Sequence, residues 1–294
     1  MSQALARKPD APALVEGEFA FTANDFAQIA QLLYEQAGIT LSDSKSTLVY
    51  SRLAKRLRAL GLASFAEYIA LVSSPAGDTE RGAMLNALTT NVTRFFREPH
   101  HFDHLRDQVL APRIAAVKAG RARMRLWSAG CSTGQEPYSI AMTVLSLLPD
   151  APNLDVKILA TDIDTKVLAT GREAIYSEEL ISAIPPEARN RWLEKDRASG
   201  DWRMSAAVRS LVSFKELNLI GQWPVKGPFD AIFCRNVVIY FDEPTQERIW
   251  SRFAPLLGTE GRMYIGHSER VAGAAGQWIS DGLTVYRHQA GGAR

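Results

Sequence analysis

The sequence has few cysteines, almost no net charge and no long apolar run, and each shortage excludes a class of protein. Two cysteines, Cys131 and Cys234, do not make a disulfide framework, and no cysteine–histidine cluster has the spacing of a metal site. The formal net charge of +2 indicates no nucleic-acid partner. No run approaches the ~18 apolar residues that span a membrane, and residues 1–18 lack the apolar segment of a signal peptide. We therefore expect a cytoplasmic protein with buried, reduced thiols.

Residues 124–142, the stretch around which the chain is organised, also lack a phosphate-binding motif. Residues 124–128 predict a strand, Gly130 and Gly134 interrupt it, and a helix follows. This order opens a doubly wound α/β domain, which binds ligands just beyond its strand tips. The glycine spacing matches neither dinucleotide nor nucleotide-triphosphate loops, and Glu136 at the helix start would repel a pyrophosphate. A ligand without phosphates fits better, although an ordinary strand–helix turn would also explain the pattern.

Polar side chains follow the next predicted strands. The strand at 156–161 ends on Asp162, an acid that is placed to accept hydrogen bonds from ribose hydroxyls. The apolar stretch 229–234 predicts a fully buried strand, which runs into Asn236. These pieces, in this order, resemble an S-adenosylmethionine-dependent methyltransferase.

Further motifs limit the resemblance to one family of these methyltransferases. They are Asn-Val-Thr-Arg-Phe-Phe-Arg-Glu at 91–98, Ala-Gly-Cys-Ser-Thr-Gly-Gln-Glu at 129–136, Cys-Arg-Asn-Val-Val-Ile-Tyr-Phe at 234–241 and Tyr-Ile-Gly-His-Ser-Glu at 264–269. Together they resemble the chemotaxis-receptor glutamate methyltransferases over roughly residues 20–288. The resemblance implies transfer of a methyl group from S-adenosylmethionine to glutamate side chains of chemoreceptors, with S-adenosylhomocysteine as the second product.

The order of elements predicts an α/β fold: a class I methyltransferase doubly wound sheet with an N-terminal helical domain and a small inserted β-subdomain. We expect a disordered arm at 1–18, the helical domain at 19–90, a linker and helix at 91–120, the cofactor-binding domain at 121–288 and a tail at 289–294. Residues 173–210 interrupt the β/α alternation, so we interpret them as the insert, with short strands at 202–204 and 207–209.

The resemblance also implies site residues. Arg97 would hold the acceptor carboxylate through two hydrogen bonds, and Tyr240 would donate another; a solvated linker arginine and a core tyrosine are the plainer alternatives. A glutamate carboxylate is ionised at neutral pH, so it needs no general base. Contacts to S-adenosylmethionine would come from Asn91, Thr93, Arg97, Ala129, Gly130, Glu136, Asp162, Asn218, Leu219, Asn236 and Val237.

A basic stretch lies in the predicted second helix. Its members are Lys45, Arg52, Lys55, Arg56 and Arg58, and no acid lies between residues 45 and 58. Pairing within the helix therefore does not explain the charges. A docking surface for acidic receptor helices and a solvated outer face remain the two explanations.

Histidines follow the linker but lack the pattern of a metal site. His101 and His104 have i,i+3 spacing on a predicted helix, and no third ligand is in view. We interpret them as surface or packing residues.

Rival functions stay open at this point. A methyltransferase acting on RNA or a small molecule would need a basic groove or a base-stacking aromatic pair at the cofactor mouth. A non-enzymatic adaptor predicts a damaged cofactor loop, yet Gly130, Gly134, Glu136 and Asp162 all remain. In some members of the resembled family the insert grips the receptor's C-terminal tail. The short strands and the loop at 195–201 favour an insert that only covers one flank. We expect a monomer.

Overall fold

The computed structural model describes residues 13–271 and 278–289, and the chain divides into two units after Thr89. Part of the arm that we expected to be disordered forms a strand: β1 (Ala13–Val15) pairs antiparallel with β2 (Phe21–Thr22). That expectation was wrong for these residues because so short a strand leaves no periodic signal. Residues 1–12 and 290–294, which cover most of the expected arm and almost all of the expected tail, lie outside the described residues.

The first unit is helical, as expected, with α1 (Ala23–Ala37), α2 (Ser46–Leu60), α3 (Phe65–Ser73) and α4 (Asp78–Leu88). Thr22 and Asp25 form a reciprocal capping box that starts α1, and Gly38 ends it in the left-handed conformation. The core of this unit gathers around the fully buried side chains of Phe65 and Tyr68. In the described part of the chain, no helix is both long enough and apolar enough to cross a membrane.

The second unit is built on a seven-stranded sheet in the order β11-β12-β10-β9-β3-β4-β8. Its parallel strands are β3 (Met124–Ala129), β4 (Val156–Asp162), β8 (Val212–Glu216), β9 (Phe229–Cys234) and β10 (Leu257–Ile265). Antiparallel pairing adds β12 (Val285–His288) and β11 (Trp278–Ser280) at one edge. The expected class I methyltransferase sheet is therefore confirmed, and the carboxyl ends of its parallel strands meet at one edge.

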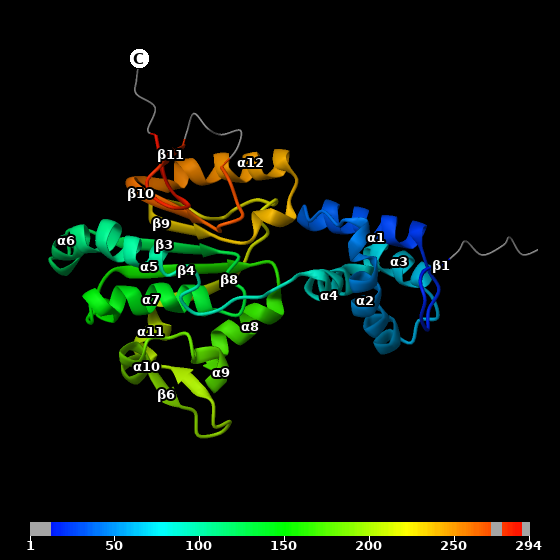
Figure 1. Ribbon diagram of the computed structural model, residues 1–294, viewed down its shortest axis with the longest axis horizontal. Coiled ribbons are helices and arrows are strands. Elements are labelled where there is room, and N and C mark those ends of the chain that lie inside the picture. Colours follow the sequence, from blue (N-terminus) through cyan, green and yellow to red (C-terminus); the bar gives the residue numbers. More distant parts are fainter. Residues whose placement is uncertain (1–12, 272–277, 290–294) are drawn as a thin grey trace, which may run out of the picture. The chain divides into compact units, whose positions relative to one another are not determined.

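Helices cover both faces of this sheet (Figure 1). One face packs against α7 (Gln135–Leu147) and α8 (Thr165–Glu173), and the other against α12 (Glu243–Phe253). Asp164 and Asp242 cap α8 and α12 with their side chains. The linker leads into α5 (His100–His104), a π-helical stretch at Leu105–Leu110, a 3-10 turn at Ala111–Arg113 and α6 (Ile114–Lys118). Both cysteines are buried and unpaired in the core around β3 and β9.

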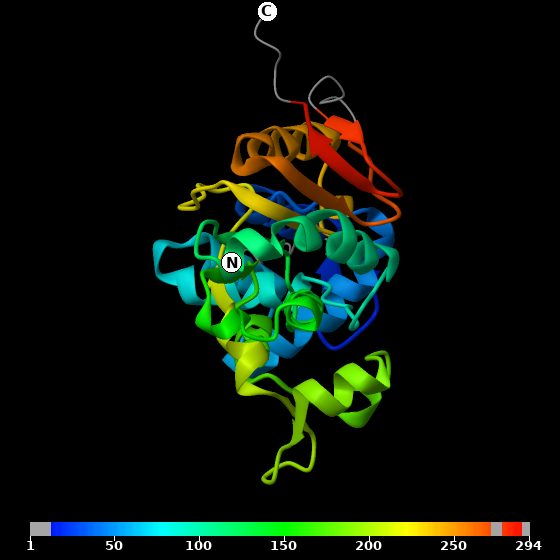
Figure 2. The ribbon, with the colours of Figure 1, turned by 90° about the vertical axis from the view of Figure 1, so that its left-hand side faces the viewer.

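The insert lies at one flank of the second unit (Figure 2) and contains a three-stranded sheet in the order β5-β7-β6. These strands are β5 (Ile175–Tyr176), β6 (Leu193–Lys195) and β7 (Trp202–Met204), with α9 (Glu178–Ile181) and α10 (Pro186–Trp192) between the first two. The strand expected at 207–209 is wrong, because these residues belong to helix α11 (Ala206–Leu211). Val208 and Leu211 are buried at helical i,i+3 spacing, a signal that a three-residue window does not contain.

Candidate active site

The glycine turn after β3 is tied to the tip of β4. The backbone N–H groups of Gly130 and Cys131 donate to the Thr161 carbonyl oxygen at 2.7 and 2.9 Å, and the Ser132 N–H donates to Asp162 Oδ2 at 2.8 Å. Gly130 has φ +85°, and a Cβ atom there would lie 2.3 Å from Cγ2 of Val237. Only glycine fits this position without strain. The turn therefore brings together Gly130, Asp162 and Val237, all of which were expected at the cofactor.

Asp162 keeps acceptor capacity for a ligand. Its carboxylate accepts backbone N–H groups from Ser132 and Asp164, and burial raises its pKa. Because a carboxylate has about four lone-pair sites, two backbone donors leave room for the two hydroxyls of a ribose. Asn91 lies beside this group, since it donates to Asp164 at 2.8 Å and its carbonyl oxygen accepts from the Ser132 hydroxyl.

A buried arginine that sequence analysis assigned no role connects Glu136 to the linker. Arg235 lies directly after the fully buried β9, and its side chain is 2% exposed. Its guanidinium lies 3.3 Å from Glu136 Oε2 and 3.5 Å from Glu98 Oε2, and it also donates to the carbonyl oxygen of Arg97. Burial raises the pKa of Glu136 in spite of this neighbouring cation. The available signal was a charge directly after a buried strand in which five of six residues are apolar, a place where a buried ion pair is required.

The backbone around Arg97 is held in an uncommon conformation. Phe96 and Glu98, on either side of it, have φ +49° and +57°, values that cost a residue with a side chain about 1–2 kcal/mol. The Phe96 N–H is held by the Ser139 hydroxyl at 2.9 Å, while Phe95 is fully buried. Such strain persists only where surrounding contacts impose it, and it gathers at functional sites.

The Arg97 side chain lines a pocket of about 330 Å³. Its guanidinium donates to the carbonyl oxygen of Val92 at 3.3 Å. Arginine and threonine donors on this wall suit an anionic group. The full lining is Val92, Thr93, Arg94, Arg97, Glu98 and His267.

Buried Glu269 ties the segment after β9 to the turn after β10. Its carboxylate accepts the backbone N–H groups of Asn236, Val237, Val238 and Gly266 at 2.6–2.9 Å. This arrangement holds Asn236 at φ +58°. This acid ends the motif at 264–269, and no role was predicted for it.

The remaining expected site residues lie at strand ends but outside the pocket wall. Ala129 is the buried last residue of β3, and Asn218 and Leu219 follow β8. Tyr240 ends a 3-10 turn at Val238–Tyr240 and is half-buried. Among the residues that the structure describes, none bonds to its hydroxyl. Tyr240 does not line the pocket, so its contact with the acceptor remains a proposal.

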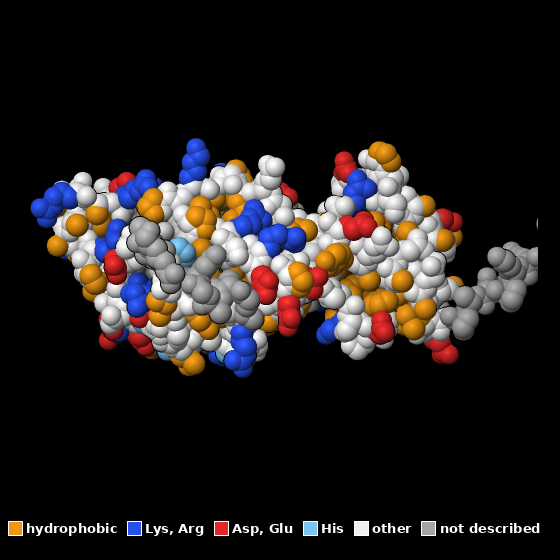
Figure 3. Space-filling view, turned by 90° about the horizontal axis from the view of Figure 1, so that it is seen from above, with side chains coloured by type: hydrophobic (Ala, Val, Ile, Leu, Met, Phe, Trp, Pro, Cys, Tyr) orange, Lys and Arg blue, Asp and Glu red, His pale blue; other side chains and the backbone are white. Residues whose placement is uncertain are grey.

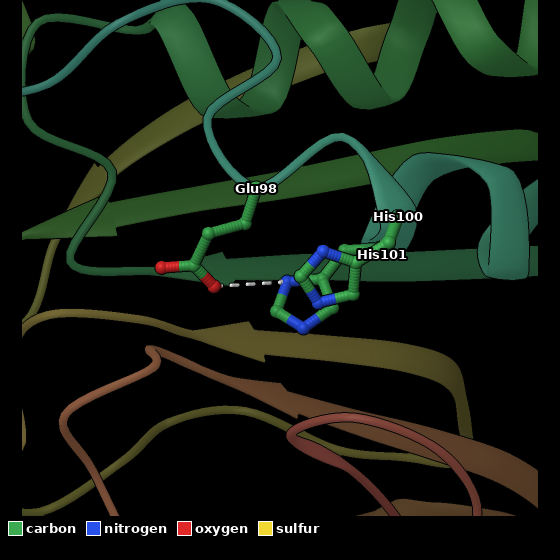
Figure 4. Close-up of side chains that lie close together, drawn as sticks. All are labelled: Glu98, His100 and His101. Carbon is green, nitrogen blue, oxygen red and sulfur yellow. Dashed lines mark ion pairs between the residues drawn. The ribbon is translucent and has the colours of Figure 1, made fainter.

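Glu98, His100 and His101 form a group with metal-site geometry, the one such group among residues 13–271 and 278–289 (Figure 4). Their ligand atoms lie within 4.8 Å of one another, and the Glu98 carboxylate points toward the imidazole rings. Arg235 lies against the same carboxylate, so a second buried cation would be repelled there. Burial and then Arg235 lower the pKa of His101 to about 3, and we interpret this group as structural.

The two histidines considered from the sequence have separate partners. Nε2 of His101, whose side chain is fully buried, lies 2.8 Å from the hydroxyl of Thr284. Nδ1 of His104 lies 3.0 Å from the hydroxyl of Tyr264. Their i,i+3 spacing therefore does not bring them to one ligand.

The three arginines of α2 have partners within the first unit. Arg52 donates to the carbonyl oxygens of the last residues of α4 and of Thr89, at 2.7–3.1 Å. Arg56 makes a bidentate ion pair with Glu80, and Arg58 pairs with Glu18. These partners come from other elements, so the spacing of charges within the helix does not reveal them. Lys45 and Lys55 are exposed, and receptor docking remains a prediction.

Comparison with known families shows which family the chain belongs to. A family model described as the CheR methyltransferase SAM-binding domain matches residues 91–286, and one described as the CheR methyltransferase all-alpha domain matches residues 24–89. The chain belongs to the CheR methyltransferase family. Its cofactor is S-adenosylmethionine, and the cradle at Gly130, Asp162 and Val237 fits that molecule because it offers ribose acceptors and no phosphate-binding loop.

Relatives in this family match nearly the whole chain. A probable chemotaxis protein methyltransferase of Rhizobium etli is 53% identical over 260 residues, which are 87% of this chain and 97% of the relative. Chemotaxis protein methyltransferase 2 of Pseudomonas aeruginosa is 44% identical over 94% of this chain and 96% of its own. The chemotaxis protein methyltransferase of Escherichia coli is 44% identical over 89% of each chain. The protein is therefore an S-adenosylmethionine-dependent methyltransferase of the chemotaxis type.

Proposed function

We propose that this enzyme transfers a methyl group from S-adenosylmethionine to glutamate side chains on the cytoplasmic helices of bacterial chemoreceptors. The products are glutamate methyl esters and S-adenosylhomocysteine, and the reaction serves chemotactic adaptation. The pocket beside Arg97 carries this proposal. Its wall offers the donor groups of Thr93, Arg94 and Arg97. Its one acid, Glu98, faces Arg235 and His267. Such a pocket suits a single carboxylate.

Different residues would contact the cofactor and the acceptor. S-adenosylmethionine supplies, when bound, a methyl group on a sulfonium that is already activated. Asp162 would accept the ribose hydroxyls, and Glu136 would face the amino group or the sulfonium. Arg97 orients the acceptor carboxylate, which is ionised and needs no base. Orientation of this kind contributes on the order of 7–11 kcal/mol to the barrier reduction.

The receptor would dock on the exposed basic side chains of α2 and of the turn before it. Lys45, which directly precedes α2, and Lys55 are exposed, so they are available to acidic helices of a receptor, while exposed Arg58 pairs with Glu18. Binding of a receptor C-terminal tail by the insert remains a separate question, and we still expect none, although β6 lies at the edge of its sheet.

An RNA substrate has less support. The net charge is +2, and the face that includes α12 shows lysine, arginine and acidic side chains interspersed rather than in a basic stripe (Figure 3). A role as a non-enzymatic adaptor would not require the intact cradle at Gly130 and Asp162.

The test is the effect of Arg97→Lys on methylation of a receptor fragment with labelled S-adenosylmethionine. Lysine loses the bidentate fork, so we expect kcat/KM to fall roughly 10- to 100-fold, the effect of about 1.5–3 kcal/mol. Arg121→Lys, at an exposed position before β3, is the matched control and should retain full activity. Equal activity of the Arg97 variant and the control would contradict the proposal.

A further inference from the structure

One pocket residue has no role in the reaction as proposed. His267 lines the same pocket as Arg97, and 68% of its side chain is exposed. It lies in the turn that follows β10, far along the chain from the linker that carries Arg97. An exposed histidine within a carboxylate pocket is a candidate contact for the substrate.

Glu98 fixes the orientation of the His267 ring. Nδ1 of the ring lies 3.2 Å from Glu98 Oε1, and the backbone N–H of His267 donates to the same oxygen at 3.3 Å. Burial alone would raise the pKa of Glu98, but Arg235 and the contacts from His267 together outweigh it and lower that pKa. Glu98 is therefore a carboxylate that only accepts. Nδ1–H therefore points at Glu98, and Nε2 is the nitrogen that no described residue engages.

Hydrogen bonds and close packing hold the turn that carries His267. Glu269 accepts the Gly266 N–H at 2.6 Å, and its own N–H donates to the Gly266 carbonyl oxygen at 2.9 Å. A Cβ atom on Gly266 would lie 2.6 Å from Nδ2 of Asn236, so the turn packs closely on the segment expected at the cofactor. A side chain that acts by position needs such support from its neighbours.

We propose that His267 holds the acceptor carboxylate together with Arg97 and makes the enzyme prefer glutamate to glutamine; this inference rests on the proposed function. In the proposed complex the ring lies between two carboxylates, and it donates from Nδ1 to Glu98 and from Nε2 to the acceptor. Glutamine has no negative charge to pair with the ring, and an ester product has none either. His267 is thus a specificity residue, while the methyl transfer itself requires no proton from it.

The experiment compares His267→Leu and His267→Gln with Ser268→Ala, a matched control at the next, exposed position of the same turn. With a receptor fragment as acceptor, the leucine variant should lose about 10-fold in kcat/KM, mostly through KM, as expected for one hydrogen bond to a charged group. The glutamine variant should recover part of this loss, because its amide still donates. Affinity for S-adenosylhomocysteine should stay within about 2-fold in all three.

A binding measurement separates a contact with the acceptor from a purely structural role of His267, because loss of a structural role would not change the preference for glutamate. Protein loaded with S-adenosylhomocysteine should bind a receptor fragment with glutamate at the methylation sites more tightly than one with glutamine. His267→Leu should reduce that preference, and Ser268→Ala should retain it.

Three outcomes would overturn the inference. If the folded leucine variant matches the wild type in kcat/KM and in its preference for glutamate, His267 does not contact the acceptor. If it loses affinity for S-adenosylhomocysteine to the same extent, the residue acts only through the turn. If the wild type labels no receptor glutamate at all, the proposed function fails and the inference falls with it.

Discussion

Replacing Glu269 by glutamine should destabilise the second unit strongly, although the side chain keeps its shape. Each carboxylate oxygen accepts two backbone N–H groups, and the residue is 4% exposed. An amide nitrogen in either orientation would face two of these donors. Two hydrogen bonds to a charged group would be lost, each worth about 1.5–3 kcal/mol, so the free energy of unfolding should fall by about 3–6 kcal/mol. That is a large share of the 5–15 kcal/mol of a typical domain.

Denaturant unfolding of Glu269→Gln measures this loss, with Glu260→Gln as the control at an exposed position in β10. Affinity for S-adenosylhomocysteine should fall in the same variant, because Asn236 and Val237 lose the carboxylate that holds them. A loss of less than about 1 kcal/mol, with an unchanged fold, would refute the reasoning, since it would mean that these hydrogen bonds do not hold the turn.

Three further outcomes follow from the site and its surroundings. Asp162→Ala should weaken binding of S-adenosylhomocysteine by roughly 1–3 kcal/mol in calorimetry, and unchanged affinity would remove the ribose assignment. Reversal of Lys45 and Lys55 to glutamate should slow receptor methylation most at low salt and leave cofactor affinity unchanged; a wild-type rate at every salt concentration would make this face merely solvated. His101 has a folded-state pKa of about 3, below its ordinary ~6.5, so the stability from its neutral form is complete above pH ~6.5 and is lost as the pH falls toward 3. His101→Phe should flatten that decline in acid-unfolding curves, and an identical pH dependence would contradict the assignment.

Local signals predicted much of the fold. The buried strand β9, the glycine turn after β3 and the strand β4 that ends on Asp162 were each visible within a few residues of sequence. These features depend on hydrogen bonds and apolar spacing inside one element. For the same reason, the helix α11 was missed, because its burial pattern appears only over its whole length.

The site was predicted through motifs, but its internal support was not. Arg235 reaches Glu136 across 99 residues, and Arg56 reaches Glu80 across 24. Such pairs depend on how distant elements pack, and neither spacing nor composition contains that information. The ligand contacts therefore stay a prediction from the motifs, whereas the structure shows which buried charges hold the predicted residues in place.

The chemistry of the product tests the central claim most directly. A receptor fragment should be incubated with methyl-labelled S-adenosylmethionine and the enzyme, and the labelled residues then identified by mass spectrometry. The account predicts label on glutamate side chains as esters that alkali releases as methanol, and no label where those glutamates are replaced by glutamine. Alkali-stable label on nitrogen, or label that persists in the glutamine-substituted fragment, would contradict it.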